Sequence, residues 1–193
     1  MIVRKYANFG PLKTATKITD AALRTIEMER DAIAQLAYFL DESFDAAIDT
    51  LAACKGRIVI SGIGKSAIIA QKIVATLNST GSPAIFLHAA DAIHGDMGMI
   101  QQEDVVMVIS KSGESPEIKV LVPLIKNFGN PLISIVGNTE SFLAKKSDFV
   151  INTTVSQEAC PNNLAPTTST TAQMVMGDAM AICLMETKEF KST

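Results

Sequence analysis

The sequence has no tryptophan, only two histidines and only three cysteines among its 193 residues. The cysteines, Cys54, Cys160 and Cys183, stand far apart and form no C-x-x-C pair, which argues against a disulfide framework or a structural zinc site. The formal net charge is −3 and no basic stripe or arginine cluster is present. We therefore expect no nucleic-acid partner.

Long apolar runs are also missing. No stretch approaches the roughly 20 apolar residues that a membrane span needs, and the N-terminus lacks the apolar core of a signal peptide. We therefore expect a cytoplasmic protein without a membrane partner. Residues 1–18 show no strong periodicity and contain Gly10-Pro11. We expect them to form an N-terminal arm, with a single domain over residues 19–193.

Strand-like and helix-like segments alternate along the chain. Apolar residues at three- and four-residue steps over 19–53 predict one long helix or two with a break near Asp41, and another helix is predicted for 168–188. Five short apolar runs predict strands at 57–61, 84–88, 105–109, 132–136 and 149–152. This alternation predicts an α/β protein, a three-layer sandwich with a five-stranded parallel, flavodoxin-like sheet.

A hydroxyl-rich segment, Ser110–Glu117, follows the third predicted strand directly. Its last three residues are typical of a helix start, with Ser115 as N-cap, Pro116 as first helical residue and Glu117 as first-turn acid. Free backbone N–H groups at a helix start favour an anion, and serine hydroxyls can donate to phosphate. The segment predicts a site for the phosphate of a small metabolite, and a polar loop that only caps a helix is the alternative.

A glycine-rich turn, Gly62–Ser66, follows the first predicted strand. A nucleotide-binding P-loop would need a glycine where Val59 stands, and the match to a dinucleotide-binding signature is loose. A tight turn that lets the backbone approach a ligand, with Lys65 and Ser66 pointing into the site, is the simpler interpretation. A solvated turn lysine remains the alternative.

Both histidines, His88 and His94, follow the second predicted strand. His94 could act as an acid or base near neutral pH. A metal site would need further ligands, for which Asp91 and Asp96 are the only local candidates, so we predict no metal.

Two carboxylates and a second hydroxyl-rich helix start complete the set of candidates. Glu117 and Glu158 stand near loop ends, and their plain alternatives are a helix-dipole acid and a surface acid. Thr167–Thr171 could be a ligand-binding helix start or only an N-cap. Cys160 is a candidate nucleophile by residue type only, and we expect instead that it packs as an unreactive side chain.

Taken together, these segments resemble the arabinose-5-phosphate isomerases of the SIS (sugar isomerase) domain family. No single segment is specific, but their order and spacing over residues 55–190 are. The segments that carry the resemblance are Gly62–Ser66, His94–Met99, Ser110–Ile118, Glu158–Pro161, Leu164–Thr171 and Met176–Ala179.

The resemblance implies interconversion of D-ribulose 5-phosphate and D-arabinose 5-phosphate through an enediol-type intermediate. That step feeds synthesis of Kdo, the eight-carbon acid sugar of lipopolysaccharide. The resemblance further implies a homotetramer and feedback binding of CMP-Kdo in the sugar site. The chemistry requires no cofactor.

Site residues are carried over by motif position. The catalytic set that the resemblance implies is Lys65, Glu117, Glu158 and His94. Lys65 is expected to stabilise developing charge, and either glutamate could be the carbon base. The substrate-binding candidates are Ser66, Ser110, Ser112 and Ser115 for the phosphate, together with Gly64, His88, Lys111 and Thr168.

The sequence departs from the family pattern in two respects. It shows neither the pair of CBS domains that many members carry nor the histidine that members place after the last helix. Two alternatives therefore stay open: a non-catalytic SIS sensor of a sugar phosphate, and an isomerase of another sugar phosphate such as a heptose or hexulose phosphate. A nucleotide-binding protein is a more distant third.

Overall fold

A single parallel sheet organises the computed structural model, which describes residues 18–188. Its strands follow the order β2-β1-β3-β4-β5, and every neighbouring pair is parallel. They are β1 (Ile58–Gly62), β2 (Ala84–His88), β3 (Val105–Ser110), β4 (Leu132–Val136) and β5 (Phe149–Asn152). The predicted five-stranded parallel sheet is confirmed, with strand bounds within one residue of those expected. Apart from Ile18, the predicted N-terminal arm lies outside the described residues.

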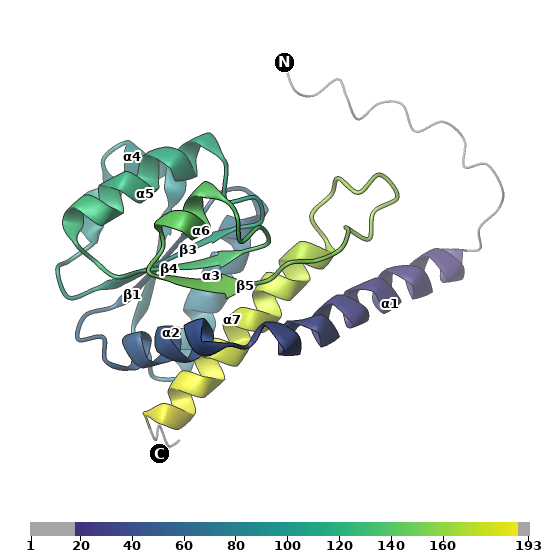
Figure 1. The fold of residues 1–193 in the computed structure, drawn as a ribbon, viewed down its shortest axis with the longest axis horizontal. Coiled ribbons are helices and arrows are strands. Elements are labelled where there is room, and N and C mark those ends of the chain that lie inside the picture. Colours follow the sequence, from purple (N-terminus) through teal and green to yellow (C-terminus); the bar gives the residue numbers. More distant parts are fainter. Residues whose placement is uncertain (1–17, 189–193) are drawn as a thin grey trace.

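Helices cover both faces of this sheet and make the predicted three layers (Figure 1). One face is covered by α2 (Glu42–Ala52), α3 (Lys65–Ser79) and α7 (Thr168–Thr187). The other is covered by α4 (Ala89–Ile93), α5 (Pro116–Phe128) and α6 (Phe142–Lys146). A short 3-10 turn, η3 (Asp96–Met99), follows α4.

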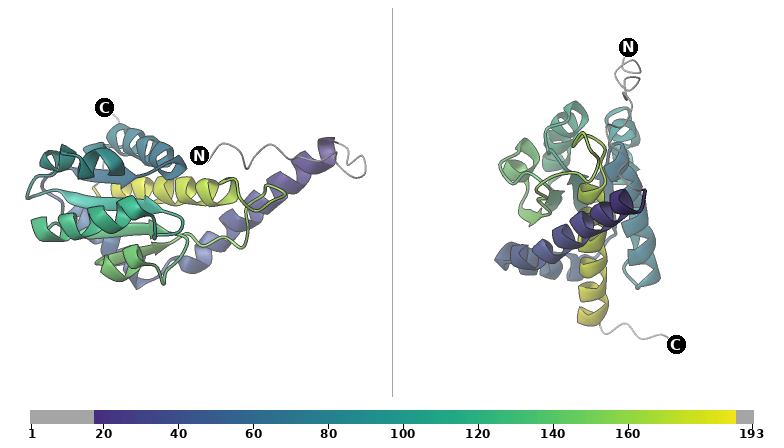
Figure 2. Two further views of the ribbon diagram at one scale, coloured as in Figure 1. Left: turned by 90° about the horizontal axis from the view of Figure 1, so that it is seen from above. Right: turned by 90° about the vertical axis from the view of Figure 1, so that its right-hand side faces the viewer.

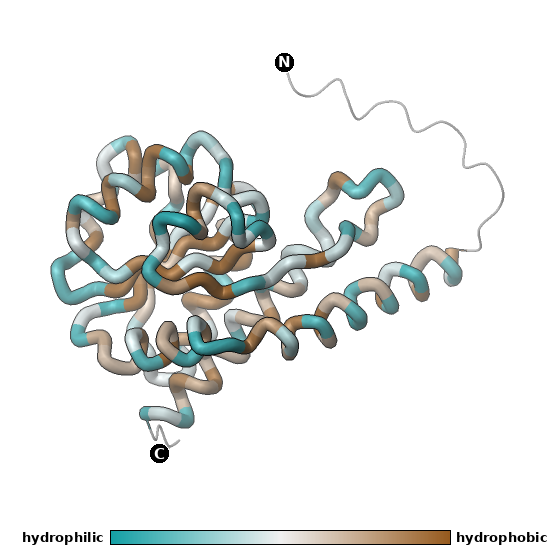
Figure 3. The backbone as a smooth tube through the Cα atoms, in the orientation of Figure 1, coloured by the Kyte–Doolittle hydropathy of each residue, from teal (hydrophilic) through white to brown (hydrophobic). Residues whose placement is uncertain are grey.

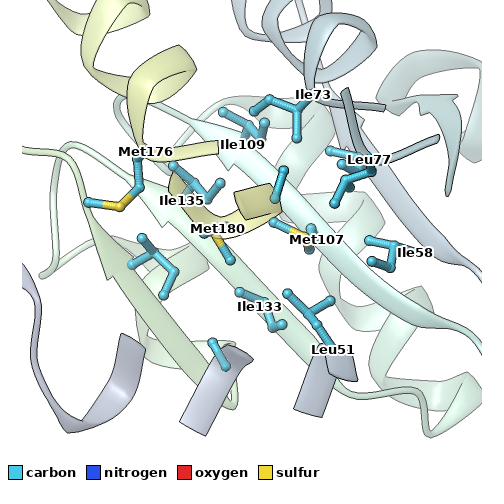
Figure 4. Close-up of a cluster of buried hydrophobic side chains, with 14 of the residues drawn as sticks. Leu51, Ile58, Ile73, Leu77, Met107, Ile109, Ile133, Ile135, Met176 and Met180 are labelled. Carbon is cyan, nitrogen blue, oxygen red and sulfur yellow. The ribbon is translucent and has the colours of Figure 1, made fainter. Parts of the chain in front are cut away.

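Alternation along each strand divides the core between the two faces. Met107 and Ile109 point toward α3 and α7, where they join a cluster that includes Ile73 (Figure 4). Val106 and Val108 point the other way, toward α4 and α5, because successive strand side chains face opposite sides. The strands are therefore apolar at nearly every position, and hydrophobic residues gather along them in the middle of the body (Figure 3).

Of the two alternatives for residues 19–53, the structure shows two helices with a break near Asp41. The first helix, α1 (Ile18–Leu36), ends in the 3-10 turn η2 (Ala37–Phe39), and the Asp41 side chain then caps α2 by accepting from two backbone N–H groups. α1 packs on α7 and reaches beyond the sheet (Figures 1 and 2). Within residues 18–188, no helix is both long and apolar enough to cross a membrane.

The strand order creates a crevice at one end of the sheet. β1 and β3 are neighbours, but the chain leaves β1 into α3 on one face and leaves β3 into α5 on the other. The two turns therefore diverge at the carboxyl ends of these strands. In open α/β sheets, ligands bind at such a switch point.

The β3–α5 turn is clamped against the start of α6. Gly113 O accepts a hydrogen bond from Leu143 N at 3.1 Å, and Glu114 Oε1 accepts one from Phe142 N at 2.6 Å. Gly113 has a φ of +64°, and a Cβ there would overlap the side chain of Ser141. Glycine at this position therefore meets two requirements, one of conformation and one of space.

Replacing Gly113 by alanine should consequently cost more stability than the same change at Gly129, the C-cap of α5. Both have positive φ, which disfavours alanine by roughly 1–2 kcal/mol, but a Cβ at Gly129 meets open space. We expect Gly113→Ala to lower the free energy of unfolding by about 1–3 kcal/mol more than Gly129→Ala, because only Gly113 is crowded. Denaturant titration of both variants measures the difference, and equal losses would show that the Ser141 side chain does not crowd a Cβ at position 113.

Candidate active site

A pocket of about 260 Å³ opens at the crevice between β1 and β3. Three segments far apart in the chain form its wall: the β1–α3 turn, the β3–α5 turn and the stretch that leads into α7. The residues that line it are Ile63, Lys65, Ser66, Ser110, Lys111, Ser112, Ser115, Pro166, Ser169 and Thr170. The two motifs predicted to bind a ligand thus meet in one pocket.

A second hollow, of about 320 Å³, lies between α2 and the end of α7. Its ionisable side chains are Asp45, Asp49, Cys183 and Glu186. It offers no positive charge to an anion, so the pocket at the strand ends is the better candidate for a phosphate.

The serines of the β3–α5 turn have hydroxyl hydrogens to offer. Ser110 Oγ accepts from Gly113 N at 3.0 Å, and Ser112 Oγ accepts from Glu114 N at 3.3 Å. Ser115 Oγ is buried without a hydrogen-bond partner in the described part of the chain. Each hydroxyl therefore has a proton available for an anion in the pocket.

The β1–α3 turn contributes a cation and a hydroxyl. Gly64, with a φ of +60°, is the N-cap of α3 and shapes the turn without lining the pocket. Lys65 follows it and is exposed. Ser66 Oγ donates to Oε1 of the buried Gln173 at 3.2 Å, so this hydroxyl must turn away from Gln173 to donate to a phosphate.

Glu158 lies behind the pocket wall rather than in it. Its side chain is fully buried, and both carboxylate oxygens hold hydrogen bonds. Oε1 accepts from Lys111 Nζ at 2.6 Å and from Ser169 Oγ at 2.5 Å. Oε2 accepts from Thr167 N at 2.9 Å and from Ser169 N at 3.1 Å. The carboxylate thus ties Lys111 to the first turn of α7.

These contacts decide the charge of Glu158. Burial is the largest single influence and would raise the pKa of this carboxyl, but the hydrogen bonds from Lys111, Ser169 and the α7 backbone together outweigh it. They lower the pKa of Glu158 to about 2. The group is therefore ionised at neutral pH, and its negative charge interacts favourably with the N-terminus of α7.

Three other predicted residues lie outside the pocket lining. Glu117 is partly buried in the first turn of α5, two residues after Ser115. His88 ends β2, where its Nδ1 is 3.7 Å from Asp91 Oδ2, too far for a hydrogen bond. His94 is exposed just after α4. Their predicted roles remain predictions.

The start of α7 enters the site in a different register from the one predicted. Thr168 is buried, does not line the pocket and leaves its Oγ1 unpartnered among the described residues, whereas Ser169 and Thr170 do line it. The sequence identified this hydroxyl-rich stretch but not the rotation of the helix. Gln173 was missed, although its position four residues after Ser169 places both on one helical face.

The histidine loop gives no support to a metal centre. Within residues 18–188, no group of three or more histidine, cysteine, aspartate and glutamate side chains is placed to hold a metal ion.

Comparison with known protein families and sequences gives consistent matches. The family described as SIS domain matches residues 50–183. The arabinose 5-phosphate isomerase KdsD of Pseudomonas aeruginosa is 52% identical over 170 residues, which cover 88% of this chain and 52% of the relative. A probable arabinose 5-phosphate isomerase of Haemophilus influenzae is 47% identical over 167 residues, covering 86% and 50%. The chain thus spans about half the length of the curated relatives it matches.

Solved structures share the fold over nearly their whole length. The c3406 protein of Escherichia coli CFT073, in complex with arabinose 5-phosphate, is 38% identical with a TM-score of 0.88, covering 93% of this chain and 95% of that one. A putative sugar-phosphate isomerase of Listeria monocytogenes is 34% identical with a TM-score of 0.87, with the same coverage. The chain belongs to the SIS domain family, and within that family it is similar to the arabinose 5-phosphate isomerases.

Proposed function

We propose that this chain is an aldose–ketose isomerase that interconverts D-ribulose 5-phosphate and D-arabinose 5-phosphate. The observation that carries the proposal is the pocket itself, in which Lys65 faces a turn of serine hydroxyls at the switch point of the sheet. The E. coli CFT073 protein, a relative covered almost end to end, was solved with arabinose 5-phosphate. The curated relatives, of which this chain covers half, bear the same activity in their names.

The β3–α5 turn would hold the phosphate. Ser110, Ser112 and Ser115 offer hydroxyl donors there, and α5 starts directly behind them. The phosphate is remote from C1 and C2, so its binding energy serves to position the reacting carbons. Lys65, on the opposite turn, would stabilise the negative charge that develops on the substrate oxygens during enediol formation.

Glu117 is the better candidate for the base that moves the proton between C1 and C2. A carbon base works best with a pKa near the operating pH and with a free oxygen. Glu158 meets neither condition, because its pKa is about 2 and both oxygens are engaged. Glu117 is the second residue of α5, two positions after Ser115, and no hydrogen bond among the described residues engages its carboxylate oxygens. His94 would assist ring opening and proton transfer on oxygen.

The wider role follows from the same proposal. The product would feed Kdo and lipopolysaccharide synthesis in the cytoplasm, without a cofactor, and CMP-Kdo would be a feedback ligand of the sugar site. The chain would assemble into a homotetramer, and the exposed apolar side chains of α1, among them Ile18, Leu23 and Ile26, support self-association.

The role of Lys65 is tested by Lys65→Ala. We expect kcat for ribulose 5-phosphate to fall about a hundredfold or more, as is typical when one group that stabilises transition-state charge is lost. The thermal midpoint should stay unchanged, because the side chain is exposed. The matched control is Lys126→Ala, in the last turn of α5 and away from the pocket. Unchanged turnover in Lys65→Ala would contradict the proposal.

The phosphate site is tested by Ser112→Ala. Losing one hydrogen bond to a charged ligand should raise KM for the sugar phosphate by about tenfold while kcat changes little. Steady-state kinetics measure both constants. Ser79→Ala, an exposed serine in the last turn of α3, should leave both as they are. A KM that does not move would place the phosphate elsewhere.

The choice of base is tested by Glu117→Gln beside Glu158→Gln. Replacing the base should lower kcat by about a hundredfold or more, with KM little changed. Glu158→Gln should instead lower the thermal midpoint, because an amide cannot accept all the hydrogen bonds that the buried carboxylate accepts. A larger loss of kcat in a folded Glu158→Gln than in Glu117→Gln would reverse the assignment.

A further inference from the structure

The pocket wall at α7 has a buried negative charge directly behind it. Ser169 lines the pocket, and its hydroxyl is 2.5 Å from Oε1 of the ionised Glu158. A carboxylate this close to the pocket, in a setting of low dielectric, would repel a phosphate dianion. A phosphate site beside Glu158 therefore needs something to cancel this charge.

Glu158 already uses part of the positive end of α7. Glu158 Oε2 already takes the N–H groups of Thr167 and Ser169, which stand at the start of that helix. Those donors are thus not offered to a ligand. The serine turn after β3, which Glu158 does not engage, is the part of the pocket that offers hydroxyl donors to the phosphate.

Lys111 stands between the carboxylate and the pocket. Its side chain is 46% exposed and lines the pocket, while its Nζ is 2.6 Å from Glu158 Oε1. Its backbone is held as well, since Lys111 O accepts from Gly137 N at 3.1 Å at the end of β4. The ammonium is therefore fixed on the pocket side of Glu158.

We propose that Lys111 is a positioning residue that neutralises Glu158, so that an anion can bind the neighbouring serine turn, and that it does not itself bind the phosphate. The inference rests on the proposed function, which places a sugar phosphate in this pocket. Moving Lys111 to the phosphate would leave a buried carboxylate without its cation, and breaking a buried ion pair is strongly unfavourable.

The test measures binding of inorganic phosphate by titration calorimetry, which does not depend on turnover. Lys111→Met should weaken phosphate binding by about tenfold, because an uncompensated negative charge then faces the ligand. Lys111→Arg keeps the cation and should restore most of the affinity. The double variant Lys111→Met with Glu158→Gln should also regain it, because the repelling charge has gone.

Lys65 provides the matched control. It lines the same pocket but makes no ion pair with Glu158. Lys65→Met leaves Glu158 neutralised by Lys111, so it should weaken phosphate binding less than Lys111→Met does. In steady-state kinetics, Lys111→Met should raise KM for the sugar phosphate about tenfold with little change in kcat, which mere loss of structure would not produce.

Several results would overturn the inference. A folded double variant that binds phosphate as weakly as Lys111→Met would show that Lys111 contacts the ligand directly. Should the double variant fail to fold, a crystal structure of the wild-type protein with phosphate decides. A Lys111 Nζ that still contacts Glu158 supports the inference, and a Lys111 Nζ that contacts the phosphate instead overturns it.

The two proposals fail in different ways. Wild-type protein that binds phosphate as described but isomerises no pentose phosphate would refute the proposed function and leave this inference standing. Wild-type protein that binds no phosphate would overturn this inference, whatever its activity.

Discussion

The buried carboxylate of Glu158 is the interaction on which the site depends. It joins three parts of the chain: the loop after β5, the strand end at Lys111 and the first turn of α7. Burial alone would favour the neutral acid, so the ionised form exists only because five donors converge on it. The pocket wall therefore rests on a buried charge that does not itself line the pocket.

The strand order explains why the pocket lies at the carboxyl ends of β1 and β3. β1 and β3 are adjacent, and their following helices lie on opposite faces, so the glycine turn and the serine turn diverge and leave the pocket between them. The clamp of Gly113 and Glu114 on α6 then fixes the serine turn from behind. The sheet therefore sets the positions of the two turns, and the contacts with α6 hold the serine turn in place.

The strands and the two pocket turns could be predicted from the sequence because each depends on a short local pattern of residues. Strand bounds followed from short apolar runs, whereas apolar periodicity alone left open whether residues 19–53 form one helix or two with a break near Asp41. The serine and glycine turns were found because each directly follows a strand. Helix rotation and long-range pairing could not be predicted in this way. Thr168 was named where Ser169 and Thr170 line the pocket, Gln173 was missed, and the Lys111–Glu158 pair joins segments that no local pattern connects.

The hydrogen bond between Ser66 and Gln173 joins positions 107 residues apart in the chain. The pocket is made of such distant segments, so no part of the chain can present it before the sheet and α7 have come together. A ligand of this pocket binds the native state and has no site on the unfolded chain. Ligand binding is therefore linked to global unfolding: it raises the free energy of unfolding by RT ln(1 + [L]/Kd) and protects β1, β3 and α7 as one cooperative unit.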